Sequence, residues 1–184
     1  MMLSLTACGN SANPVPPEDV SIAVDDTAWK TAYSEFLNGE SGKFSLIYLN
    51  DDDIPEIAIV NGSAHANGVA LYTYDDGDVE EISEKVGTYG TFLYEERGGM
   101  IAYDNGGNGS VMANIILSWD GSELVQEHEF IWSFSSDTYV MDGESVSESA
   151  YNDAWTSLTS DYKTVNSETC IEINEANIQS ELDL

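Results

Sequence analysis

Basic side chains are the scarcest feature of this sequence. Five Lys and Arg stand against 34 Asp and Glu in 184 residues, which gives a formal net charge of −29 at pH 7. Binding of nucleic acid depends on clustered Lys and Arg at the phosphates, and docking to anionic lipid depends on a basic patch. The composition therefore excludes nucleic acid as a partner, and it excludes a membrane surface bound through charge.

Cysteine and histidine are almost as rare. The chain has only Cys8, Cys170, His65 and His128, and their spacing matches neither a disulfide scaffold nor a zinc site. It also lacks a Gly-x-Ser-x-Gly elbow, a phosphate-binding loop and, in its domain, any apolar run long enough to span a bilayer. The remaining residues suffice for a core, because 42% are hydrophobic and 10% aromatic.

The first residues contain the stretch Leu5-Thr6-Ala7-Cys8. It resembles a bacterial lipobox, in which the Cys becomes the new N-terminus and is diacylated, so the resemblance implies lipidation at Cys8. Only seven residues precede Cys8 and none is basic, and we therefore expect residues 1–8 to be a truncated lipoprotein signal. The alternative is a chance Cys in an irregular start.

A proline-rich polar stretch follows. Residues 9–24 hold three of the four prolines and show no helical or strand period, which is typical of an extended tether. We expect a single α+β domain over residues 25–184. The predicted location is extracytoplasmic, with a lipid on Cys8 as the sole attachment to the outer face of the cell membrane.

The second cysteine is interpreted from its neighbours. Cys170 lies in Thr169-Cys170-Ile171-Glu172-Ile173, where a lone Cys is typically a small buried residue of a strand. A Cys8–Cys170 disulfide is the alternative if no lipid is attached.

Hydrophobic periodicity predicts one helix near each end of the domain. Asp25 or Asp26 can cap the first helix and Ser147 the second. The apolar stripe of the first helix comprises Trp29, Tyr33, Phe36 and Leu37. The stripe of the second comprises Tyr151, Ala154, Trp155 and Leu158. The last stretch, 175–184, is either a short helix or a frayed end.

Between the helices the period changes to that of strands. Short apolar runs separated by Gly turns predict an antiparallel β-meander of about eight strands, with one helix before it and one after it. Segments 71–77 and 116–121 share a pattern that ends in an Asp-Gly turn, and we interpret them as two similar hairpins of one sheet. The predicted strands are 44–49, 56–60, 69–74, 79–82, 91–94, 100–103, 111–119, 123–125 and 139–141.

The acidic segment 50–56 is the clearest candidate for a functional site in the sequence. It concentrates carboxylates between two apolar strands, and hard oxygen ligands suit Ca²⁺. The candidate metal ligands are Asn50, Asp51, Asp52, Asp53 and Glu56. An EF-hand is excluded because its twelfth position would be Asn61 rather than Glu. The alternative is a solvated turn in which Asn50 or Asp51 caps backbone N–H groups.

This segment resembles the Asp-rich calcium loop of FG-GAP and VCBS-type repeats. The third, fifth and ninth positions of that loop fall on Asn50, Asp52 and Glu56, whereas its first falls on Tyr48 and its usual Gly on Asp53. The resemblance implies a structural Ca²⁺. The order of segments over 26–162 is also similar to uncharacterised lipoproteins of Gram-positive bacteria, a resemblance that implies no activity.

The favoured function is a non-enzymatic surface lipoprotein that binds an extracellular protein or glycan, or acts as an accessory subunit of an envelope complex. The alternative is an exported glycosidase-like hydrolase that uses a carboxylate pair, Glu127/Glu129 or Asp75/Asp76. A sugar-binding platform has candidate aromatics, although strand alternation turns at least half of them to the core. These are Tyr72, Tyr74, Tyr89, Tyr94, Tyr103, Trp119 and Trp132.

Overall fold

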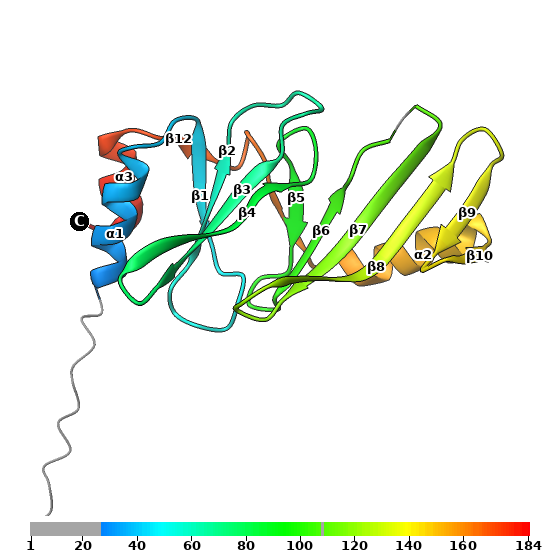
Figure 1. Ribbon diagram of the computed structural model, residues 1–184, viewed down its shortest axis with the longest axis horizontal. Coiled ribbons are helices and arrows are strands. Elements are labelled where there is room, and N and C mark those ends of the chain that lie inside the picture. Colours follow the sequence, from blue (N-terminus) through cyan, green and yellow to red (C-terminus); the bar gives the residue numbers. More distant parts are fainter. Residues whose placement is uncertain (1–26, 108) are drawn as a thin grey trace, which may run out of the picture.

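The computed structural model describes residues 27–107 and 109–184, and within them it shows three helices and two antiparallel sheets (Figure 1). The predicted α+β class, with antiparallel hairpins between an early and a late helix, is confirmed. Cys8 and the predicted tether lie outside the described residues. Among those residues, no helix is long and apolar enough to cross a membrane.

A five-stranded sheet forms one half of the molecule. Its order is β12 (Ile171–Glu172), β1 (Lys43–Ile47), β2 (Glu56–Val60), β3 (Val69–Asp75) and β4 (Asp78–Val86). Helices α1 (Ala28–Leu37) and α3 (Glu175–Leu182) cover its outer face (Figure 1). Tyr33, Leu37, Ile178 and Leu182 of these helices are buried there against strands β1 and β2.

A seven-stranded sheet forms the other half. Its order is β10 (Glu144–Val146), β9 (Thr138–Met141), β8 (Leu124–Ser133), β7 (Val111–Trp119), β6 (Met100–Asp104), β5 (Phe92–Tyr94) and β11 (Lys163–Val165). Helix α2 (Glu148–Thr159) packs on one face, where the Phe130 ring meets Tyr151 and Trp155, each at 5.4 Å. Ser147 caps α2 as predicted, because its Oγ accepts the Ala150 N–H at 3.2 Å.

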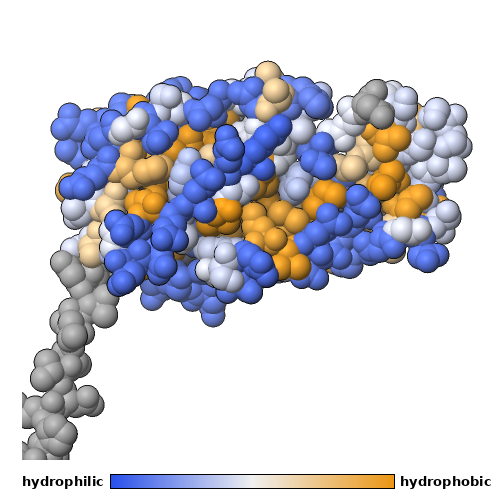
Figure 2. All heavy atoms as spheres, viewed as in Figure 1, coloured by the Kyte–Doolittle hydropathy of each residue, from blue (hydrophilic) through white to orange (hydrophobic). Residues whose placement is uncertain are grey.

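The main core lies between the two sheets. The alternate residues Ala58 and Val60 of β2 point into it, together with Leu49, and meet Ile101 and Trp119 of the seven-stranded sheet. Residues of β2 that point the other way, such as Ile57, contact the helices instead. All five residues of β2 are buried, because this strand has a covering layer on both faces. On the face seen in Figure 2, hydrophobic side chains gather along the middle and hydrophilic ones surround them.

The strand pattern differs from the prediction in number and grouping. There are twelve strands rather than about eight among the described residues. The short strands β10 and β11 were not predicted, whereas β12 lies in the segment 169–173 that was interpreted as a strand. Strand β8 continues through a polar run to Ser133, because the whole length of β7 pairs with it. The two similar hairpins lie in different sheets, β3–β4 in one and β7–β8 in the other, so the prediction of one sheet was wrong.

The ends of the domain also needed correction or completion. Helix α1 begins after Thr27, while Asp25 and Asp26 lie outside the described residues. The stretch 175–184 forms a helix, which resolves the alternative left open by its pattern. Cys170 is a free, buried thiol as predicted, but it precedes β12 rather than lying within a strand.

Candidate functional site

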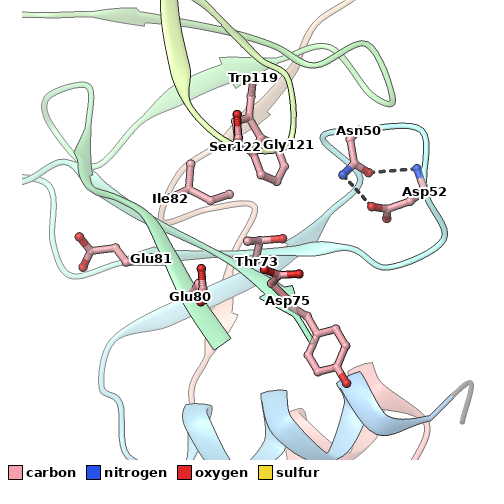
Figure 3. A pocket seen from close by; sticks show the side chains of 11 residues that line it. Asn50, Asp52, Thr73, Asp75, Glu80, Glu81, Ile82, Trp119, Gly121 and Ser122 are labelled. Atoms are coloured by element: carbon pink, nitrogen blue, oxygen red, sulfur yellow. Dashed lines mark hydrogen bonds between the residues drawn. The ribbon is translucent and has the colours of Figure 1, made fainter. Parts of the chain in front are cut away.

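The acidic loop between β1 and β2 is held by hydrogen bonds of its own. The Asp52 N–H donates to Asn50 Oδ1 at 3.0 Å, and the Asn50 amide donates to Asp52 Oδ2 at 2.7 Å (Figure 3). The Ile54 N–H in turn donates to Asp52 Oδ1 at 2.8 Å. Asn50 thus caps the Asp52 N–H, as the solvated-turn alternative predicted, and Asp52 in turn caps the Ile54 N–H.

Glu56 stands apart from the other candidate ligands because its side chain is fully buried. Its Oε2 accepts the Leu49 N–H at 2.7 Å, while its Oε1 has no hydrogen-bond partner. The pKa of Glu56 is raised to about 7. Burial is the main cause and the negative charge of Asp52 adds to it, whereas the hydrogen bond from the Leu49 N–H opposes the rise. A carboxyl in this position closes the loop at its base, where Tyr33 also donates to the Pro55 carbonyl at 2.7 Å.

Arg97, from the turn between β5 and β6, places its guanidinium over the acidic loop. Its Nη1 donates to the Asp52 carbonyl at 2.8 Å, and its Cζ lies 4.6 Å from the centre of the Tyr48 ring. The guanidinium also comes within 4.0 Å of Asp51 Oδ1 and 3.5 Å of Asp53 Oδ1. One cation therefore reaches the backbone or side chain of all three consecutive aspartates.

The backbone of the same turn joins the two sheets. The Arg97 N–H donates to the Tyr48 carbonyl at 2.8 Å, and the Gly99 N–H donates to the Leu49 carbonyl at 2.7 Å. The Gly99 carbonyl accepts the Trp119 N–H at 2.7 Å. Gly99 has φ of 72°, and a Cβ there would lie 2.9 Å from the Trp119 carbonyl oxygen, so the close approach requires glycine.

The five candidate metal ligands thus have three different surroundings. Asn50 and Asp52 are adjacent, with oxygens that already accept N–H groups of the loop. The side chains of Asp51 and Asp53 are 93% and 99% exposed and face Arg97, whereas Glu56 is buried behind them. Within residues 27–107 and 109–184, no group of three or more His, Cys, Asp and Glu is arranged to hold a metal ion.

A cleft of about 450 Å³ opens beside the loop, between the two sheets. Four acidic residues line it, while Trp119 and Ile82 supply the apolar part. The Glu81 carboxylate points away from the cleft, toward the face of the sheet that carries Tyr72 (Figure 3). Glu80 and Glu81 come from β4, Asp75 ends β3, and Asp52 belongs to the acidic loop. No Lys, Arg or His is among the residues that line the cleft. Its chemistry therefore favours a ligand with positive charge.

The carboxylate pairs considered for a hydrolase are not brought together in a buried site. Glu127 is exposed and accepts the Ser118 hydroxyl at 2.6 Å, and Asp76 lies in the exposed β3–β4 turn. Asp75 alone of these four acids lines the cleft. Among the described residues, Glu56 is the one buried carboxylate, and with 0% exposure it has no access to a substrate.

The candidate aromatics are dispersed over three hydrophobic clusters. Tyr94 and Trp119 are buried between the sheets, and Trp132 stacks on Tyr139 at 5.8 Å near α2. Only Tyr89, at 50% exposed, is largely open to solvent among the seven predicted for a sugar platform. The expectation that at least half face the core is confirmed.

Sequence reasoning missed Arg97, Glu80 and Glu81. Arg97 lies 44 positions after the loop it contacts, so no local pattern links it to Asp53. One signal was present in the composition. With five basic residues for 34 acids, each Lys or Arg is a candidate partner for the densest acidic cluster. Glu80 and Glu81 looked like ordinary exposed strand positions, and only the approach of the second sheet makes them line a cleft.

The fold and the site together define a protein of two antiparallel sheets with an acidic cleft between them and an arginine-braced loop at its edge. Comparisons with protein-family models, with curated proteins and with solved structures found no match.

Proposed function

We propose that this chain is the extracytoplasmic domain of a lipid-anchored surface protein, and that it binds a positively charged segment of an extracellular protein without catalysing a reaction. The lipobox at Leu5–Cys8 and the proline-rich stretch after it support the location. The observation that carries the binding proposal is the cleft, whose lining contains four acidic residues and no basic residue.

The lining of the cleft suits a Lys or Arg side chain. Asp52, Asp75 and Glu80 offer charge, and Trp119 with Ile82 offers an apolar surface for the aliphatic stem of such a side chain. The net charge of −29 adds a long-range attraction that speeds the encounter with a basic partner. A protein partner is favoured over a glycan because the exposed aromatics form no continuous platform among the described residues.

The position of the cleft supports an extended partner. Glu80, Glu81 and Ile82 belong to β4, a nine-residue strand at the edge of the five-stranded sheet. An extended segment is able to add to such an edge by backbone hydrogen bonds while alternate side chains enter the neighbouring cleft. The same acids also discourage unspecific pairing between edges, which is a common use of charge on edge strands.

Calorimetric titration with a nonapeptide of alternating Lys and Val tests the proposal. Asp75→Asn/Glu80→Gln is expected to bind it about fivefold more weakly than the wild type, since two exposed charge pairs contribute about 1 kcal/mol. Glu144→Gln/Glu181→Gln is the control, because it removes the same charge from exposed positions outside the cleft and is expected to bind like the wild type.

Equal weakening in both double variants contradicts the proposal, because the attraction then belongs to the net charge alone. The hydrolase alternative has its own readout. Release of reducing sugar from a glycan by the wild type, and its loss in Glu80→Gln, would favour catalysis over binding.

A further inference from the structure

The acidic loop has its positive charge supplied from within the chain. We propose that the Arg97 guanidinium is the resident counter-ion of the loop 50–55, so that the loop keeps its shape without a divalent cation. This inference is independent of the proposed ligand of the cleft. It follows from how the guanidinium is held and from how the oxygens of the loop are used.

The oxygens of Asn50 and Asp52 already accept hydrogen bonds from within the chain. Asn50 Oδ1 and Asp52 Oδ1 accept the N–H groups of Asp52 and Ile54 at 3.0 and 2.8 Å. The Asp52 carbonyl accepts a charged donor, Arg97 Nη1, at 2.8 Å. A hydrogen bond from a guanidinium is stronger than one between neutral groups, and it places the positive charge beside the three aspartates.

Two residues where this loop departs from the calcium-loop pattern are contacts of Arg97. Tyr48 provides an aromatic face 4.6 Å from the guanidinium carbon, a distance at which a cation and a ring attract each other. Asp53 adds a carboxylate 3.5 Å from Nη2. Tyr48 favours a planar organic cation over a metal ion, because its ring face attracts a guanidinium and a neutral phenol is a poor calcium ligand compared with a carboxylate.

The main chain fixes the guanidinium in place. Arg97 has φ of 60°, a left-handed conformation within the tight turn after β5. Its N–H donates to the Tyr48 carbonyl at 2.8 Å. The backbone and the side chain of Arg97 therefore both form hydrogen bonds to the chain between β1 and β2, from a turn of the other sheet. The Arg97 side chain is 38% exposed, compared with 93% and 99% for Asp51 and Asp53, because it lies between the loop and the Tyr48 ring. Lysine lacks the planar fork needed for these simultaneous contacts.

Thermal unfolding of the full chain, after removal of divalent ions with EDTA, tests the inference. The wild-type midpoint is expected to stay constant when about 2 mM CaCl₂ is added, a concentration in the range of extracellular calcium modules. Arg97→Met, which keeps the aliphatic stem, is expected to lower the midpoint by about 5 °C, and Arg97→Lys is expected to recover only part of that loss. Lys85→Met is the control, because it removes one positive charge from an exposed site away from the loop and is expected to change the midpoint little.

The outcomes separate the alternatives. A calcium-induced rise of the wild-type midpoint that disappears in Asp52→Ala would overturn the inference and support the calcium prediction. An Arg97→Met midpoint equal to that of Lys85→Met would overturn it as well. If Arg97→Met does not fold, Asp51→Asn/Asp53→Asn in that background decides: recovery of folding supports a counter-ion role, and failure to recover contradicts it.

Discussion

At the residue scale, Glu56 is the most unusual group in the molecule. Its carboxyl is buried with one oxygen bonded to the Leu49 N–H and the other without a hydrogen bond. Because burial disfavours the charged form, the pKa of Glu56 rises from 4.5 to about 7. The folded state therefore retains a proton in a pH range where the unfolded state has already lost it.

Glu56→Gln is expected to change how stability depends on pH. Because the folded pKa of Glu56 is raised, the contribution of this carboxyl to stability is greatest below about pH 4.5. That contribution decreases until about pH 7, by about 3 kcal/mol in total. Glutamine keeps an oxygen for the Leu49 N–H and carries no charge, so this decrease is removed. Urea unfolding at about pH 5 and about pH 8 measures it, with exposed Glu181→Gln as the control. Parallel pH profiles for the wild type and Glu56→Gln would contradict the expectation.

At the element scale, helix α3 shows how a weak pattern becomes a firm structural element. Asn174 caps it through the Asn177 N–H at 3.0 Å, and Asp183 ends it in a left-handed conformation. Ile178 and Leu182 are buried against α1 and the five-stranded sheet. A short polar helix of eight residues is marginal alone, so this packing holds it in place.

Leu182→Ala is expected to lower the free energy of unfolding by about 2–4 kcal/mol, since it removes a fully buried side chain and leaves a cavity in a packed cluster. Leu184→Ala is the matched control, because Leu184 is 59% exposed and two positions away. Denaturant unfolding of both variants measures the difference. Equal stability of the two variants would show that the helix is frayed in solution.

At the scale of the whole molecule, the net charge of −29 acts on stability as well as on binding. The protein exposes 11602 Å², so 29 evenly spread net charges lie about 20 Å apart. This spacing exceeds the Debye length of about 8 Å at physiological ionic strength, but it is shorter than the length of about 30 Å at 0.01 M salt. Repulsion among the acids is therefore screened in saline and felt at low salt.

The thermal midpoint is expected to rise by several degrees when NaCl is increased from about 0.01 M to about 0.15 M at neutral pH. Near pH 4, where many carboxylates are protonated, the rise is expected to be smaller. Scanning calorimetry at the four combinations measures both effects. A midpoint that is independent of salt at pH 7 would show that long-range repulsion does not limit this fold.

Parts of the structure that depend on local pattern were predictable. Strands β2 and β7 have the predicted bounds, because a run of apolar residues between turn signals specifies each one. Ser147 caps α2 for an equally local reason. Strands β10 and β11 were not predictable, because they exist only where an already formed strand offers free backbone groups to pair with.

The site followed the same division. Sequence alone determined where the acids concentrate and that the antiparallel hairpins carry an early and a late helix, and it left Asn50 and Asp51 as the two candidates for capping the acidic turn. Only the tertiary structure decided that Glu56 is buried, that Arg97 lies over Asp51 to Asp53, and that Glu80 and Glu81 line a cleft. The physical reason is distance along the chain: periodicity and capping act within a few residues, whereas burial and charge pairing depend on which sheet packs against which.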